Sequence, residues 1–201
     1  MSLAADQIDS LRRALDRVSG ASSDFDLNAD GARPASRTLH PAGVLAAFSE
    51  TPEGLSLVLT KRSSRLKHHP GQIAFPGGKQ DDTDPDVTAT ALREAQEEVG
   101  LPPESVEVLG VLPDHETVTG FLMTPVIGIL RAPFEPVPEP GEVEEVFTAP
   151  FAHVTDPARY SVQYRRWRGT RRHYYAVPLG PYYIWGATAR ILRGLAERVS
   201  A

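Results

Sequence analysis

Three of the five residues from Glu94 to Glu98 are glutamates, within the segment REAQEEVGL. On a helix, Glu94, Glu97 and Glu98 fall within about 100° of one another, so their charges repel by about 0.2–0.5 kcal/mol per pair. Acids near the C-terminal end of a helix also oppose its macrodipole. The grouping therefore lowers stability unless a cation is bound, and carboxylate oxygens are hard ligands that suit Mg²⁺ or Mn²⁺.

A solvated acidic helix face is the simpler interpretation, and for an isolated pair of glutamates it would be preferred. The segment from Arg93 to Gly100, however, carries Arg, Glu, Glu, Glu and Gly at fixed offsets, which chance gives in roughly one window in 10⁶. It also follows FPGGK, residues 75–79, whose glycines let backbone groups approach a ligand closely. The whole pattern favours a site.

Residues 85–99 have the signals of the helix that would position these acids. Asp84 can cap its N-terminus, Pro85 suits the first helical position, and Gly100 suits the left-handed C-terminal position. A stripe that would face the core lies well away from the glutamates. It consists of Thr88, Leu92, Ala95 and Val99.

Strand patterns surround this helix. Residues 42–50 and 54–62 predict a hairpin around the turn TPEG, and residues 71–79 predict a short strand that runs into a glycine turn. With a terminal helix at 186–199, this order predicts an α/β (α+β) fold in which a mixed sheet lies between helices. Further strands are expected at 105–114, 121–131 and 142–150, and a basic hairpin at 163–179 with its turn near Gly169.

The N-terminal part of the chain is predicted to be a helix followed by a connector. Residues 6–18 carry an apolar stripe at helical spacing, and residues 19–36 are rich in Gly, Ser, Asp and Ala. We therefore expect a helix and connector over 1–38 and the main domain over 39–201, as one globular unit. The stripe consists of Ile8, Leu11, Leu15 and Val18.

The composition excludes several classes of protein. The 201 residues include no cysteine, so thiol nucleophiles and zinc-thiolate sites are ruled out. The net charge of -5 disfavours a nucleic-acid partner. There is no apolar run of membrane-spanning length and no apolar signal core at the N-terminus, so a cytoplasmic location is expected.

Residues 78–101 resemble the signature of the Nudix hydrolases: Gly, five residues, Glu, seven residues, then Arg-Glu-aliphatic-x-Glu-Glu-x-Gly-aliphatic. The matching positions are Gly78, Arg93, Glu94, Ala95, Glu97, Glu98, Gly100 and Leu101. Asp84 stands where the family has its first Glu, and eight residues separate it from Arg93. In the family that acid orients the arginine. The alternatives to Asp84 here are Asp81, Asp82 and Asp86.

Residues 59–79 resemble the signature that precedes this box in the coenzyme A pyrophosphatase branch, which runs Leu-Thr-x-Arg-Ser, a basic residue, Gly, then Phe-Pro-Gly-Gly. The matches are Leu59, Thr60, Arg62, Ser63, Gly71, Phe75, Pro76, Gly77 and Gly78. Lys67 stands where the branch usually has Arg, which keeps the charge but loses the bidentate fork. The resemblance covers about residues 40–195.

This resemblance implies metal-dependent hydrolysis of the pyrophosphate of CoA, or of an acyl or oxidised CoA, to 3′,5′-ADP and 4′-phosphopantetheine. Mg²⁺ or Mn²⁺ is the implied cofactor, and Glu94, Glu97 and Glu98 are the implied metal ligands. Glu94 and Glu98, one helical turn apart, are the first choice. Arg93 would hold the carboxylates in place.

The general base is left open between a glutamate of the box and an acid on a later loop. The loop candidates are Glu142, Glu144 and Glu145. Residues around the glycine segment could contact the substrate's phosphates, although solvated surface is an equally weighted interpretation of the charged ones. These candidates are Arg62, Ser63, Lys67, Gly77, Gly78 and Lys79.

An arginine-rich segment admits three interpretations: a nucleic-acid grip, an exposed partner surface, or a contact to the 3′-phosphate of CoA. It comprises Arg165, Arg166, Trp167, Arg168, Arg171 and Arg172. The aromatic residues that follow are interpreted as sheet and core packing. They are Tyr174, Tyr175, Tyr182, Tyr183 and Trp185.

The leading hypothesis is therefore a CoA pyrophosphatase that acts on a small-molecule substrate. One alternative is a Nudix enzyme for another diphosphate, such as ADP-ribose, a nucleotide sugar or a dinucleoside polyphosphate. Another is a non-catalytic module that binds nucleotide or RNA, against which the three intact glutamates argue. No membrane partner is expected, and a monomer and a homodimer are both left open.

Overall fold

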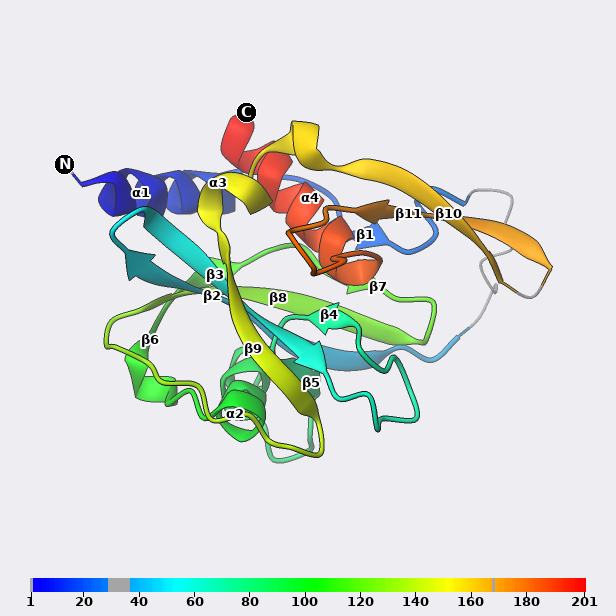
Figure 1. The fold of residues 1–201 in the computed structure, drawn as a ribbon, viewed down its shortest axis with the longest axis horizontal. Coiled ribbons are helices and arrows are strands. Elements are labelled where there is room, and N and C mark those ends of the chain that lie inside the picture. The colour runs from blue at the N-terminus through cyan, green and yellow to red at the C-terminus, as the bar shows by residue number, and fades with distance from the viewer. Residues whose placement is uncertain (1, 29–36, 168) are drawn as a thin grey trace.

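The computed structural model describes residues 2–28, 37–167 and 169–201, and shows a mixed sheet with helices on both of its faces (Figure 1). This architecture confirms the predicted α+β class. Arg168 and the last part of the predicted connector lie outside the described residues. None of the described helices is long and apolar enough to cross a lipid bilayer.

The strands of the main sheet are β1 (Ser22–Ser23), β2 (His40–Thr51), β3 (Gly54–Arg62), β4 (Ile73–Ala74), β5 (Gly77–Lys79), β6 (Val106–Val111), β7 (His115–Glu116), β8 (Phe121–Leu130) and β9 (Val143–Pro150). A separate hairpin consists of β10 (Ser161–Trp167) and β11 (Thr170–Ala176). The helices are α1 (Leu3–Asp16), α2 (Val87–Val99), α3 (Phe151–Val154) and α4 (Ala187–Ser200), with 3₁₀ turns at Pro103–Ser105 and Pro157–Arg159.

Strand β2 organises the sheet. It pairs in parallel with β8 and in antiparallel with β3, which it reaches through the tight turn predicted from the sequence. Strand β3 then pairs with β9, with an irregularity between Lys61 and Arg62. Strand β5 pairs with the first part of β2, where Gly78 lies opposite Gly43 and Gly77 lies opposite Val44. The glycine segment is thereby fixed to the centre of the sheet.

The core lies on both faces of the sheet, as the period-two alternation of β2 requires. Leu45 and Ala47 pack with buried residues of α2 on one face. Val44, Ala46 and Phe48 pack on the other face, in the cluster that contains α1 and α4. Figure 1 shows α2 on one side of the sheet and the pair α1 and α4 on the other.

Helix α2 starts later than predicted. Its N-cap is Asp86, whose carboxylate accepts the N–H of Ala89 at 2.8 Å. Asp84 therefore does not cap the helix, and Pro85 precedes the helix and does not occupy its first position. Gly100 does end the helix, in the left-handed conformation with φ 72°. The buried stripe of α2 also differs from the predicted one, since it includes Glu98. Its members are Thr90, Ala91, Ala95, Glu98 and Val99, whereas Thr88 and Leu92 are only half-buried.

The predicted glycine turn is a strand. Gly77 and Gly78 belong to β5, and Gly77 adopts φ 151°. A Cβ at Gly77 would lie 2.4 Å from the carbonyl oxygen of Gly43, so this close strand approach needs glycine. The strand and the preceding β4 pair with different neighbours, β2 and β3 respectively.

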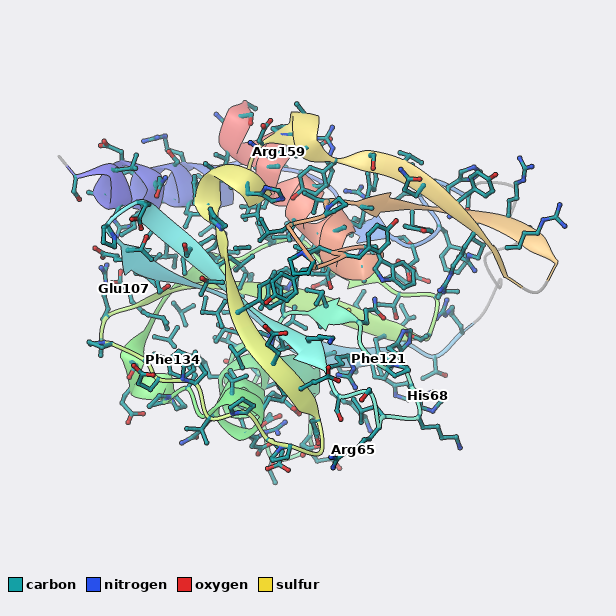
Figure 2. All side chains as sticks on the ribbon, in the orientation of Figure 1. Arg65, His68, Glu107, Phe121, Phe134 and Arg159 are labelled. Atoms are coloured by element: carbon teal, nitrogen blue, oxygen red, sulfur yellow. The ribbon has the colours of Figure 1, made fainter. Side chains whose placement is uncertain are left out.

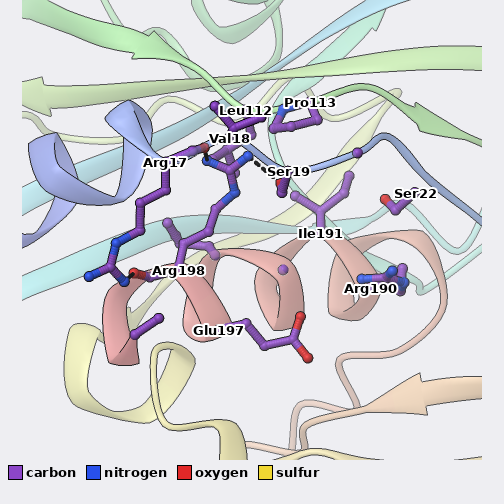
Figure 3. A pocket seen from close by; sticks show the side chains of 14 residues that line it. Arg17, Val18, Ser19, Ser22, Leu112, Pro113, Arg190, Ile191, Glu197 and Arg198 are labelled. Carbon is purple, nitrogen blue, oxygen red and sulfur yellow. Dashed lines mark hydrogen bonds between the residues drawn. The ribbon is translucent and has the colours of Figure 1, made fainter.

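The N-terminal helix is part of the globular unit. Leu11 is fully buried, whereas Val18, predicted to continue the apolar stripe, lies beyond the helix and is exposed. Arg198 of α4 donates to the carbonyls of Ala14 and Arg17, each at 2.7 Å, and holds the end of α1. Figure 3 shows Arg198 beside Arg17. These contacts border a cavity of about 300 Å³ between α4 and the connector.

Candidate active site

Glu98 is a buried carboxylate on the face of α2 that meets β5. It is 4% exposed, and its Oε2 accepts the backbone N–H of Gly77 at 3.1 Å. The pKa of Glu98 is raised to about 7, chiefly because burial disfavours the charged carboxylate; the charges of Glu142 and Glu94 also raise it, whereas the Gly77 hydrogen bond and Arg62 lower it. Such a carboxylate gains from a nearby cation.

Glu94, one helical turn earlier, lies against the other glycine of β5. A methyl group on Gly78 would be only 2.4 Å from the carboxylate carbon of Glu94. Burial raises the pKa of Glu94, Arg93 opposes this shift, and the charges of Glu97 and Glu142 add to it. The two box glutamates thus converge on adjacent glycines, and the absence of a Cβ at Gly78 makes room for one of them.

Arg93 is held by a bidentate fork to Asp84. Its Nε donates to Oδ1 and its NH2 to Oδ2, both at 2.9 Å. The Arg93 guanidinium holds the pKa of Asp84 well below its usual range, and Thr90 Oγ1 donates a further bond at 2.9 Å. Of the alternatives, Asp81 lies at 3.9 Å from the guanidinium and Asp86 caps the helix. Asp84 is therefore the acid that orients Arg93. No feature of the sequence indicated that Thr90 also binds Asp84.

Glu97 is oriented differently from the other two glutamates. Its side chain is 59% exposed, and its Oε2 accepts a hydrogen bond from Arg93 NH1 at 2.9 Å. No group of three or more His, Asp or Glu side chains within the described ranges is assembled closely enough to hold a metal ion. Glu94 and Glu98 fit a hard divalent cation as a pair, because each is acidic, partly desolvated and destabilised by like charges. The metal-ligand roles of all three stay predictions.

The three acids on the later loop have different surroundings. Glu144 binds Lys61 Nζ at 2.6 Å, and this bond lowers the pKa of Glu144. Glu145 accepts a hydrogen bond from the hydroxyl of Tyr182. Glu142 is exposed, and its charge raises the pKa of both box glutamates. Of the three acids, Glu142 is therefore the one whose charge acts on the box glutamates.

The residues predicted to contact phosphate also differ in their burial and in their interactions. Arg62 is half-buried, and its charge lowers the pKa of Glu98. Ser63 is buried, and its hydroxyl accepts a backbone N–H within the following turn. Lys67 and Lys79 are exposed. Of these side chains, Arg62 is the one whose charge acts on a glutamate of the box.

The fold and this site define the class of protein: an α+β hydrolase whose acids lie on the helix of a Nudix-type box. Residues 39–171 match the NUDIX domain family. The protein named "Uncharacterized Nudix hydrolase NudL" of Cronobacter sakazakii is 44% identical over 158 residues, which cover 79% of this chain and 82% of that protein. NudL of Klebsiella pneumoniae is 44% identical over 160 residues, 80% of this chain and 83% of that protein. The chain therefore belongs to the Nudix hydrolase family.

A solved structure supports the fold. A MutT/nudix family protein from Enterococcus faecalis superposes with a TM-score of 0.54 at 13% identity, over 86% of this chain and 66% of that chain. The NUDIX domain of Shewanella oneidensis NrtR, crystallised with ADP ribose, gives a TM-score of 0.46 at 21% identity, over 63% of this chain and 82% of that chain. Nudix hydrolases as a family use divalent metal ions such as Mg²⁺ or Mn²⁺.

Proposed function

We propose that this Nudix hydrolase cleaves the pyrophosphate of CoA and its acyl or oxidised derivatives, giving 3′,5′-ADP and 4′-phosphopantetheine. The observation that carries this proposal is the contact between Gly77 and Glu98. Gly77 belongs to the segment that resembles the CoA pyrophosphatase signature, and its N–H donates to the buried carboxylate of the box at 3.1 Å. The charge of Arg62, from the same segment, also lowers the pKa of that carboxylate. The substrate signature and the hydrolytic box thus meet at one place.

In this proposal each side chain has a physical task. Glu94 and Glu98 would hold Mg²⁺ or Mn²⁺, and a bound divalent ion supplies charge neutralisation of the pyrophosphate and lowers the pKa of a water ligand. Arg93, fixed by Asp84, keeps the carboxylates in place. Arg62 would bind a phosphate oxygen.

Glu142 is the proposed general base. It would take a proton from the attacking water, whose oxygen joins one phosphorus while the bond from that phosphorus to the bridging oxygen breaks. Glu144 and Glu145 are less suited to this step, because Lys61 and Tyr182 already occupy them. Changing Glu142 to Gln should lower kcat with little change in KM, since the substrate contacts remain.

The proposal is tested by incubation with CoA and Mg²⁺ in ¹⁸O-labelled water, followed by mass spectrometry of both products. We expect label in one product only, which identifies the phosphorus attacked. Glu98→Gln should reduce turnover by about 100-fold or more, since loss of an outer-shell partner alone typically reduces activity 10–100-fold. The glutamine oxygen can still accept the Gly77 N–H, so the fold should persist, as circular dichroism can verify.

Glu53→Gln is the matched control, because Glu53 is an exposed residue of the β2–β3 turn. Its activity should equal that of the wild type. Cleavage of ADP-ribose, a nucleotide sugar or a dinucleoside polyphosphate in preference to CoA would replace the proposed substrate. If no diphosphate is cleaved and RNA binds with a steep salt dependence, the non-catalytic module is correct instead.

A further inference from the structure

A second cavity, of about 330 Å³, lies between the loop that follows β3 and the hairpin β10–β11. Small-molecule sites typically occupy roughly 300–1,000 Å³, so this cavity is at the lower end of that range. Figure 2 shows Arg65 and His68 of the same loop in the lower right part of the view. The cavity is lined by His69, Pro70, Gly71, Gln72, Arg165 and Trp185.

One face of the hairpin is turned toward this cavity. The guanidinium of Arg165 lies 4.5 Å from the ring centroid of Trp185, and Tyr174 meets the same indole edge-on at 5.0 Å. Side chains alternate along a strand, so Arg166 belongs to the opposite face. Trp185, expected from the sequence to be a packing residue, is only half-buried and keeps surface available to a ligand.

The cavity wall is continuous with the active site. The backbone N–H of Arg62 donates to the carbonyl of Gln72 at 3.0 Å, and the N–H of Gly71 donates to the carbonyl of Arg62 at 3.0 Å. The next residue, Ser63, donates its N–H to the carbonyl of Glu142 at 2.8 Å. Backbone hydrogen bonds therefore connect residues that line the cavity to both the phosphate-binding arginine and the proposed base.

The loop that closes the cavity is held in an uncommon conformation. His69 has φ 54°, which non-glycine residues rarely adopt, and its carbonyl accepts the N–H of Gln72 at 3.3 Å. Positive φ values outside glycine persist where surrounding contacts fix them, and they gather at ligand-binding segments. The turn keeps Pro70 and Gly71 at the cavity, opposite the hairpin.

We propose that this cavity binds the phosphorylated nucleoside end of the substrate, with the 3′-phosphate on Arg165 and the base against the indole of Trp185. A guanidinium binds phosphate through two parallel hydrogen bonds, and an indole offers a stacking surface to any base. Two of the residues that line the cavity, Gly71 and Gln72, are hydrogen-bonded to Arg62 of the candidate active site. This inference rests on the proposed function and makes the hairpin the part that distinguishes CoA from diphosphates without a 3′-phosphate.

Arg165→Gln tests the phosphate contact. We expect its KM for CoA to rise about tenfold, while its KM for dephospho-CoA, which lacks the 3′-phosphate, stays unchanged. Arg166→Gln is the matched control, because it removes the neighbouring charge from the opposite face and should leave both KM values unchanged. Equal effects of the two variants on the two substrates, or no effect of either, would overturn the inference.

A binding measurement separates this inference from the proposed function. Calorimetry without metal should show that the wild type binds 3′,5′-ADP about tenfold more tightly than 5′-AMP, and that Arg165→Gln removes the difference. Equal affinity of the wild type for the two nucleotides refutes the subsite even if CoA is cleaved. The expected preference supports the subsite even if the catalytic assay fails, in which case only the proposed function is lost.

Discussion

The clamp between Arg93 and Asp84 shows how a departure from a family signature is accommodated at the residue scale. Aspartate is one methylene shorter than the usual glutamate, and one extra residue separates it from the arginine. Because α2 begins only after Asp86, Asp84 stands in the preceding turn and reaches Arg93 from outside the helix. Both carboxylate oxygens then bind the guanidinium at 2.9 Å. The clamp therefore depends on turn geometry as well as on side-chain length.

Gly78→Ala should reduce hydrolysis by about 100-fold while the protein stays folded. The new methyl group would overlap the carboxylate of Glu94, which is the mobile end of a side chain and can turn away. A displacement of about 1 Å in a catalytic group can reduce the rate by roughly 10²-fold. Steady-state kinetics with a thermal melt checks both parts. Wild-type activity in the variant would show that the position of Glu94 is unimportant.

At the element scale, the approach of α2 to β2 fixes the box relative to the glycine strand. Gly43 of β2 allows this approach, because a Cβ there would lie 2.2 Å from the carbonyl oxygen of Val87 and 2.8 Å from the amide nitrogen of Ala91. Both atoms belong to the backbone of α2 and cannot rotate away. Gly43 also lies opposite Gly78 in the β2–β5 pairing. The same residue thus sets the helix–sheet distance and neighbours the site.

Gly43→Ala should therefore lower the free energy of unfolding by about 1–3 kcal/mol, the usual effect of overpacking. Urea denaturation measures this change. Gly20→Ala is the control, because no heavy atom lies within 4 Å of a Cβ at Gly20, and its effect should stay within about 0.5 kcal/mol. Similar midpoints for the two variants would mean that α2 shifts without loss, and the tight packing argument would be wrong.

On the scale of the whole molecule, the connector is tied to the main domain by a buried polar contact. Asp24 Oδ1 lies 3.2 Å from Nε2 of His115, which is fully buried in β7. Its other oxygen accepts the N–H of Val118 at 2.8 Å. Burial raises the pKa of Asp24, but the His115 contact and the Val118 bond outweigh it, so the net pKa is lowered. Helix α1 thus shares the core of the main sheet, and Asp24 of the connector adds this polar contact.

This contact predicts a pH dependence of stability. Because the folded pKa of Asp24 lies below its unfolded value of about 4, the carboxylate stabilises the fold above that pH and loses this contribution as pH falls through the folded pKa. Asp24→Asn should lower the free energy of unfolding by about 1–3 kcal/mol at pH 7, with a smaller difference from wild type in acid.

Urea denaturation across this pH range measures the effect, and Asp9→Asn serves as the control because Asp9 forms only an exposed ion pair with Arg12. A difference between wild type and Asp24→Asn that stays constant with pH would contradict the assignment. A control variant that reproduces the same pH dependence would contradict it equally.

The sequence alone predicted the strands of the β2–β3 hairpin, the helix that bears the glutamates, the glycine at its end and the family of the chain. These features depend on local periodicity, turn residues and fixed spacing, all of which lie within about 25 residues of one another. Spacing alone placed the core stripe of α2 partly on the wrong residues, so Glu98 was expected well away from the core stripe but lies in it.

Only the tertiary structure decided which acids meet. In the folded protein Glu97 is hydrogen-bonded to Arg93 and Glu144 to Lys61, whereas the charge of Glu142 acts on Glu98 of the box. It also places an arginine hairpin beside the loop after β3, a contact between segments about 95 residues apart. Such pairings follow from how strands are ordered in the sheet and from burial on its two faces, and neither is encoded in the spacing of nearby residues.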